Sequence, residues 1–138
     1  MMATIRIAAA FVLREDGETL LVRKRGTRAF MQPGGKLEPG EDARSALLRE
    51  IEEEIGLALT SDRLVPLGHF EADAANEPGS RVVADVFRID VAMLKVTPAA
   101  EIEEIVWILP EQAEALDLAP LTRDHILPAY RASLVAAS

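Results

Sequence analysis

Cysteine is absent from the 138-residue chain. Its absence excludes disulfide bonds, thiolate metal sites and a cysteine nucleophile, and it fits a reducing compartment, so we expect a cytoplasmic protein. Basic residues are also scarce: 15 Lys and Arg stand against 23 Asp and Glu, a formal net charge of −8. This balance argues against a nucleic-acid polymer or an anionic membrane surface as the main partner.

The sequence also lacks an apolar run long enough to span a bilayer. The apolar segment nearest the start, residues 5–13, is short and precedes a charged turn at residues 14–17. We therefore expect a buried first strand there rather than a signal peptide, and no membrane partner. With 49% apolar residues the chain can bury one core but not two, so we expect a single domain over residues 1–138. A homodimer is left open.

The stretch from Gly34 to Leu57 organises the rest of the chain. Its second half has the signals of a helix: a Pro-Gly break at residues 39–40, two acidic residues at the expected N-terminus, and Gly56 where a left-handed cap belongs. These signals predict a helix from about Asp42 to about Ile55.

Three glutamates share one side of that predicted helix. Glu50, Glu53 and Glu54 fall within an arc of about 100°, beside a flank of apolar residues that should pack into a core. The apolar residues are Leu47, Leu48, Ile51 and Ile55. Like charges this close repel, and a divalent cation would turn the repulsion into binding. The alternative is an acidic face that is merely solvated.

The pattern resembles the box of the Nudix (MutT-type) hydrolases, and no position of the box is missing. Its residues here are Gly35, Glu41, Arg49, Glu50, Ile51, Glu53, Glu54, Gly56 and Leu57. The resemblance covers only residues 35–57, but a chance match of this kind is on the order of one in ten million. It implies an α/β fold, an α/β/α sandwich with a mixed β-sheet between helices, and hydrolysis of a diphosphate bond with Mg²⁺ or Mn²⁺.

The resemblance also implies roles for single residues. Glu50 and Glu54 correspond to the principal metal ligands, and the Gly34 carbonyl to the backbone ligand of the loop. Glu53 would be a further ligand or the catalytic base, and Arg49, one turn earlier, would hold its carboxylate.

Further roles fall on the box entrance and on a loop late in the chain. Glu41 would contact metal-bound water, while Gly35 and Lys36 would lie against the substrate. Glu101 and Glu103 occupy the place from which this family draws a general base or an extra ligand. Solvated glutamates ahead of a strand are the alternative for that pair.

A hairpin is predicted ahead of the box, with a second strand over residues 19–25 after a turn. Alternation puts Arg23 and Arg25 on one face and Lys24 on the other. Arg23 or Lys24 could meet substrate phosphates, or simply end a solvated strand. Phe30 could stack on a base, with a core position as the alternative.

Beyond the box we expect strands over residues 64–71, starting after Pro66, over residues 81–93, and at the end of residues 101–109. A short helix should start at Pro110, and residues 121–136 should be helical with a bend or break near Pro128.

The substrate is narrowed by elimination. Subfamilies acting on ADP-ribose tend to carry a proline about fifteen residues past the box, and those acting on dinucleoside polyphosphates a tyrosine slightly further on. Residues 72–75 occupy that region and contain neither. The isomerase relatives use a cysteine, which is absent. We expect a small-molecule nucleoside di- or triphosphate substrate, with nucleoside triphosphates favoured, nucleotide sugars as the alternative, and a non-catalytic nucleotide-binding module as the rival.

Overall fold

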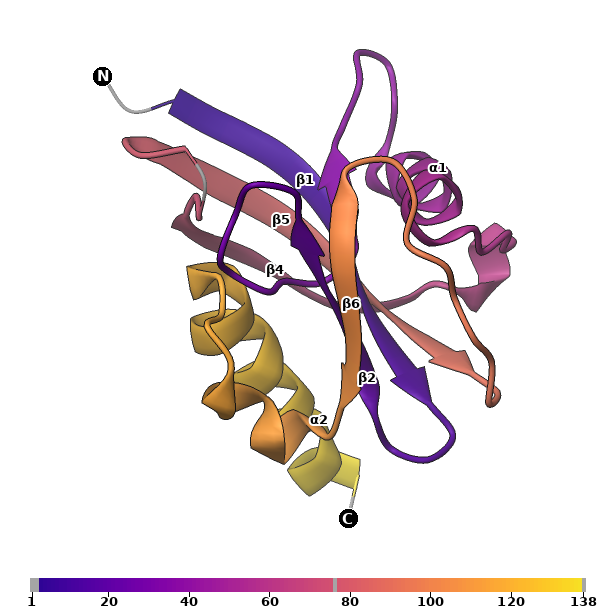
Figure 1. Cartoon of the computed structure of the whole chain (residues 1–138). Coiled ribbons are helices and arrows are strands. Elements are labelled where there is room, and N and C mark those ends of the chain that lie inside the picture. The colour runs from indigo at the N-terminus through magenta and orange to yellow at the C-terminus, as the bar shows by residue number, and fades with distance from the viewer. Residues whose placement is uncertain (1–2, 76, 138) are drawn as a thin grey trace.

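Strand β1, Ala3–Arg14, is the strand on which the sheet is built in the computed structural model (Figure 1). The structure describes residues 3–75 and 77–137. The other strands are β2 Thr19–Lys24, β3 Gly34–Lys36, β4 Val65–Asp73, β5 Ser80–Val91 and β6 Ile102–Ile108. The α-helices are α1 Ala43–Ile55 and α2 Leu127–Ala137, and short helical turns cover Ser61–Arg63, Pro110–Ala115 and Thr122–Ile126.

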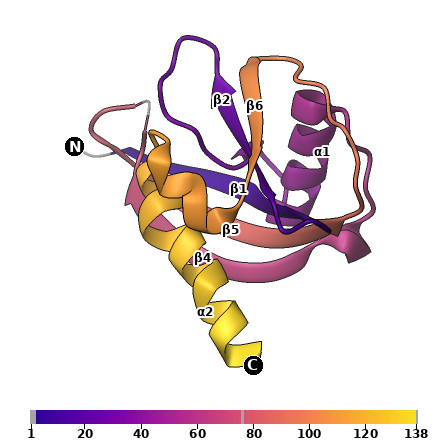
Figure 2. The ribbon, with the colours of Figure 1, turned by 60° about the horizontal axis from the view of Figure 1, so that its bottom comes forward.

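The sheet is mixed, in the order β4-β5-β1-β2-β6, with β3 also paired to β1. β1 and β5 run parallel along their whole length, whereas the remaining pairs are antiparallel. Helices α1 and α2 lie on opposite faces of the β1–β5 part of the sheet (Figure 2). The predicted mixed sheet between helices and the predicted hairpin are confirmed.

Alternation along β1 explains why it reads as an unbroken apolar run. Ala8, Ala10 and Val12 belong to the core under α1, and Ala9 and Phe11 to the core under α2. A strand covered on both faces needs apolar residues at every position. The predicted buried first strand is confirmed.

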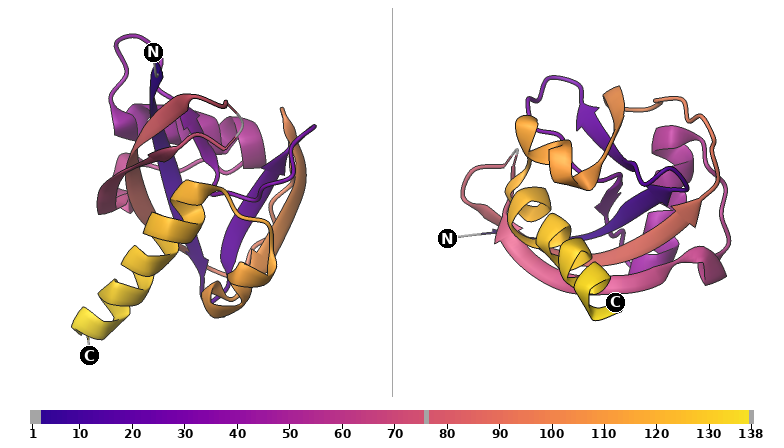
Figure 3. Two further views of the ribbon diagram at one scale, coloured as in Figure 1. Left: turned by 90° about the vertical axis from the view of Figure 1, so that its left-hand side faces the viewer. Right: turned by 90° about the horizontal axis from the view of Figure 1, so that it is seen from below.

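β2 leaves β1 soon after the hairpin turn, and this divergence makes room for the site. The two strands are in register only at Leu13 and Thr19, while residues 7–9 of β1 pair with β3 instead. Figure 3 shows β2 and β6 splayed away from β1 and β5. Residues 30–33 bridge the gap, with Met31 paired to Val22 and the Ala10 N–H donating to the Pro33 carbonyl at 2.9 Å.

Helix α1 begins and ends within a residue of its predicted limits. Asp42 is the N-cap, and its side chain accepts a hydrogen bond from the Ser45 N–H at 2.8 Å. Gly56 takes the left-handed conformation at φ 70° and donates its N–H to the Glu52 carbonyl. Both signals are local, which is why the sequence predicts them.

Two expected boundaries differ in the structure. β4 starts at Val65, ahead of Pro66 rather than after it, because β4 is an edge strand and the register shifts by a bulge between Pro66 and Gly68. The expected break near Pro128 takes the form of the π-helical turn Thr122–Ile126, in which the Leu127 N–H reaches back to the Thr122 carbonyl. Pro128 has no N–H for the regular helical bond, so the ladder is disturbed just ahead of it.

Within the described part of the chain, none of the helices combines the length and apolar character that a membrane crossing requires.

Candidate active site

Glu54 lies in the last turn of α1 and is buried, with 1% of its surface exposed. The Gly34 N–H donates to its Oε1 at 2.9 Å. Its Oε2 is buried without a hydrogen-bond partner among the described residues. Burial raises the pKa of the Glu54 carboxyl to about 7. The alternative of a merely solvated acidic face does not hold for Glu54, because β3 packs directly over the end of the helix.

Glu50 lies one turn before Glu54 and against Gly35. A Cβ at residue 35 would stand 2.5 Å from the Glu50 Cδ, so glycine is what lets the carboxylate lie against the β3 backbone. Gly34 is equally constrained, since its φ is 149° and a Cβ there would overlap the Ala8 carbonyl. Burial raises the pKa of the Glu50 carboxyl, and the neighbouring Arg49 guanidinium opposes the rise.

Arg49 ties the box loop to the helix. Its Nε and Nη2 each donate at 2.8 Å to one oxygen of Glu41, and its Nη1 donates to the Glu50 Oε1 at 2.8 Å. The guanidinium hydrogen bonds hold the pKa of the Glu41 carboxyl down at about 2. Arg49 was predicted to hold Glu53, yet that contact is a 3.6 Å ion pair and the shorter bonds go to Glu41 and Glu50.

Glu53 is far more exposed than Glu50 and Glu54. Its side chain is 54% exposed and forms a 3.6 Å ion pair with Arg49, and its negative charge also acts on Glu50. Over residues 3–75 and 77–137, no three His, Asp or Glu side chains are placed closely enough together to bind one metal ion. The structure therefore shelters Glu50 and Glu54 from solvent and leaves Glu53, the third predicted side-chain ligand, exposed.

The glutamates of the late acidic loop contact side chains on opposite faces of β2. The Ala99 N–H donates to the Glu54 carbonyl at 2.9 Å, which ties this loop to the end of α1. Glu101 pairs with Lys24 at 3.2 Å, and its charge contributes to the raised pKa of Glu54. Glu103 pairs instead with Arg23 at 3.6 Å. Of the two predicted glutamates, only Glu101 lies toward Glu54.

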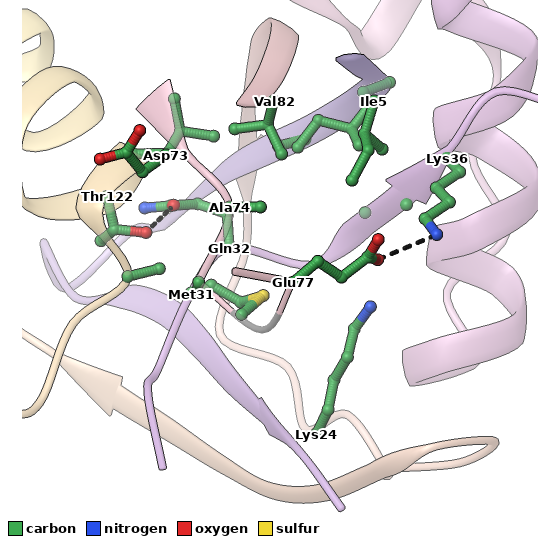
Figure 4. A pocket seen from close by; sticks show the side chains of 18 residues that line it. Ile5, Lys24, Met31, Gln32, Lys36, Asp73, Ala74, Glu77, Val82 and Thr122 are labelled. Atoms are coloured by element: carbon green, nitrogen blue, oxygen red, sulfur yellow. Dashed lines mark hydrogen bonds and ion pairs between the residues drawn. The ribbon is translucent and has the colours of Figure 1, made fainter. Parts of the chain in front are cut away.

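A pocket opens beside the box, and Gly34 and Gly35 form part of its wall. Lys24 and Lys36, two of the predicted substrate-binding residues, also line it (Figure 4). Arg23 does not line this pocket, and the prediction that β2 alternation separates it from Lys24 is confirmed. Phe30 is 9% exposed in the core under α2 and is not part of the wall, so the structure supports its core alternative.

The pocket wall also contains residues that no sequence pattern singled out, among them Gln32, Asp73 and Thr122. Gln32 stands two residues before the glycine pair, which is the only local signal that could have singled it out. Asp73 and Thr122 reach the pocket through the sheet pairing of β4 and through the turn before α2, which no local pattern indicates.

The residues present fit a divalent cation. Glu54 offers a buried carboxylate oxygen without a partner, and Glu50 a second carboxylate whose ionised form is also disfavoured by burial. Carboxylate oxygens are the donors that Mg²⁺ and Mn²⁺ prefer, and a cation would compensate the buried charge of Glu54 and the partly buried charge of Glu50. The Gly34 N–H fixes the orientation of the Glu54 carboxylate.

Comparison with known proteins agrees with this geometry. A family model described as NUDIX domain matches residues 3–130. The chain is 33% identical over 126 residues to the CTP pyrophosphohydrolase of Escherichia coli strain K12, covering 86% of each chain. It is 37% identical over 71 residues to the 8-oxo-dGTP diphosphatase of Haemophilus influenzae, covering 49% of this chain and 52% of that one.

A solved structure shows the same fold. The solution structure of the E. coli ORF135 protein superposes with a TM-score of 0.76 at 28% identity, covering 98% of this chain and 94% of that one. The predicted Nudix fold and resemblance are therefore confirmed. The chain belongs to the NUDIX family and is a Nudix hydrolase, an enzyme of the class that acts on nucleoside diphosphate derivatives.

Proposed function

We propose that the protein is a pyrophosphohydrolase of nucleoside triphosphates that depends on Mg²⁺ or Mn²⁺. The observation that carries the proposal is the buried Glu54 carboxylate. Its Oε2 has no hydrogen-bond partner among the described residues, and its Oε1 accepts from Gly34, which lines the pocket together with Lys24 and Lys36. A buried carboxylate in this state destabilises the fold, and a bound cation would remove that penalty.

Glu54 and Glu50 would hold the cation, with the Gly34 carbonyl and Glu53 as further proposed ligands. A bound divalent cation supplies charge neutralisation to the diphosphate and lowers the pKa of a coordinated water. Arg49 keeps Glu50 in place and bonds Glu41 at the same time, so the helix and the preceding loop hold one geometry. Glu41 acts in this account through Arg49.

Lys24 and Lys36 would bind the phosphates. In the structure each pairs with a glutamate, Lys24 with Glu101 at 3.2 Å and Lys36 with Glu77 at 3.0 Å. Both glutamates are half-exposed, so these pairs contribute little and the substrate's phosphates can replace them. Arg23 is bound by Glu103 and Glu104 and contributes at most indirectly.

The general base is the finer part of the proposal. If Lys24 binds the substrate phosphates, its ion pair with Glu101 is broken, and the Glu101 carboxylate is then unpaired close to Glu54. Glu103 pairs with Arg23 instead, so Glu101 is the better candidate for the base. Glu53 remains the other proposed base, since it is exposed on the same helix.

The choice of a triphosphate rests on two arguments. Both relatives named above act on nucleoside triphosphates according to their names, and residues 72–75 carry neither family signature for other substrates. Nucleotide sugars remain the alternative substrate, and a binding module without catalysis the rival function. A single functional domain over residues 1–138, a cytoplasmic location and a homodimer stay predictions.

The test is a screen of nucleoside triphosphates and nucleotide sugars with Mg²⁺, with products identified by mass. We expect nucleoside monophosphate and pyrophosphate, no turnover in excess chelator, and recovery on adding Mg²⁺ or Mn²⁺. Full activity in chelator would contradict the mechanism. Binding without any product would favour the module.

A further inference from the structure

Gln32 and Thr122 form a buried polar pair in the pocket wall, separate from the carboxylates. Gln32 is 5% exposed and Thr122 is 1% exposed. The Thr122 hydroxyl donates to the Gln32 Oε1 at 2.7 Å. The Gln32 Nε2 is buried, and no described residue accepts a hydrogen bond from it. A buried amide donor without an acceptor is unfavourable, so a group that supplies the acceptor would be bound there.

The backbone around Gln32 is held rigidly. Met31 exchanges two hydrogen bonds with Val22 of β2, at 2.7 and 2.9 Å. Phe30 bonds on its other side to residues 117 and 119, which lead into the Thr122 turn. Since the Thr122 hydroxyl occupies the amide oxygen, Nε2 is the end of the amide left to donate. A base that reaches it would displace the wall atoms that cover it.

The pocket has two chemically different ends. Figure 4 shows Gln32, Thr122 and Asp73 gathered at one end and the lysines at the other. Ile5 and Val82 are part of the apolar wall of the same pocket. The cavity measures about 120 Å³. A nucleotide with its phosphates at the lysines would place its planar base between apolar walls and its polar edge near the amide.

We propose that Gln32, positioned by Thr122, is a specificity-determining residue that donates a hydrogen bond from its side-chain amide to an acceptor on the nucleobase. The acceptor is a carbonyl oxygen or an unprotonated ring nitrogen at the base edge. This inference rests on the proposed function, because it takes a nucleotide as the substrate. Thr122 acts as a positioning residue through Gln32.

Gln32→Glu replaces the donor by an acceptor at constant length, so it should change which base is preferred. We expect the ratio of kcat/KM between the best and worst of CTP, UTP, ATP and GTP to change by at least about tenfold. Thr122→Val should move the ratio in the direction of unity. Gln112→Glu, at an exposed position outside the pocket, is the matched control and should leave it unchanged. A general loss of stability would lower all four values together.

Binding of α,β-methylene triphosphate analogues of the four bases, followed by calorimetry, gives a readout that needs no turnover. If Gln32→Glu does not fold, Gln32→Met carries the same prediction with a ratio nearer to unity. Turnover by the native protein with a base ratio that neither Gln32 variant moves by more than about twofold would overturn this inference and leave the proposed function standing. Base-selective binding that depends on Gln32, without turnover of any nucleotide, would support it while the proposed function fails.

Discussion

Glu54 is a buried carboxyl group whose ionised form is disfavoured by its surroundings. Its pKa rises from 4.5 to about 7 on burial, so folding favours the protonated form. The neutral carboxyl therefore supports stability below pH 4.5, and that contribution is lost as the pH rises to 7. At pH 8 without metal, the ionised group destabilises the fold by roughly 3 kcal/mol.

Glu54→Gln should therefore stabilise the metal-free protein at pH 8 and have little effect at pH 4.5. The neutral amide can still accept from the Gly34 N–H and carries no charge to bury. Thermal unfolding in chelator at both pH values measures the difference. Glu52→Gln, at an exposed position on the same helix, is the control. Equal stability of Glu54→Gln and the native protein at pH 8 would show that the buried charge has no penalty.

Gly35 and Gly34 differ in what a methyl group would meet. At Gly35 the neighbour is the end of the Glu50 side chain, which can move, whereas at Gly34 it is the Ala8 backbone. Gly35→Ala should displace Glu50 and lower kcat by more than about tenfold with the fold retained. Gly34→Ala should lower the free energy of unfolding by about 1–3 kcal/mol or more, and its melting temperature should fall accordingly.

Gly40→Ala provides the comparison for both variants. Gly40 also has a positive φ, 82°, but a Cβ there would meet nothing within 4 Å. It should lose stability from backbone strain alone and keep its metal-dependent activity. Native activity in Gly35→Ala would mean that the position of Glu50 is not critical.

At the scale of elements, the ends of α1 were predictable because their causes are local. Asp42 and Gly56 act on backbone groups within four residues of themselves. The burial of Glu54 was not predictable, because it depends on β3 lying over the helix, and Gly34 is twenty residues away in the chain. The Gln32–Thr122 pair spans 90 residues, so no spacing in the sequence indicates it.

The Arg49–Glu41 contact joins the box loop to α1. Its contribution to the free energy of unfolding should be lost at low pH. The pKa of Glu41 falls from 4.5 to about 2 because of the Arg49 hydrogen bonds. The contribution is therefore present above pH 4.5 and is lost as the pH falls through 2. Glu41→Gln should be less stable than the native protein at pH 7, and the difference should shrink at pH 2.5. Urea midpoints at the two pH values measure it, and a constant difference would contradict the assignment.

At the scale of the whole molecule, the site exists because β1 and β2 diverge instead of pairing along their whole length. β1 is shared between two cores, and β2 departs from it, so that β3 and residues 30–33 enter the gap. The carboxylates come from the helix on one face, and residues 119–122, ahead of α2, complete the other end of the pocket. The sequence motif indicated Glu50 and Glu54 on one helix behind a glycine loop, whereas the end of the pocket at Gln32 and Thr122 is assembled from segments that only the fold brings together.

The proposed mechanism requires a divalent cation at the Glu50 and Glu54 carboxylates. The most direct measurement is a Mn²⁺ titration followed by electron paramagnetic resonance, comparing the native protein with Glu54→Gln at pH 8. We expect the native protein to bind Mn²⁺ and Glu54→Gln, still folded, to bind it at least about 100-fold more weakly. The same binding curve for both proteins would contradict the account.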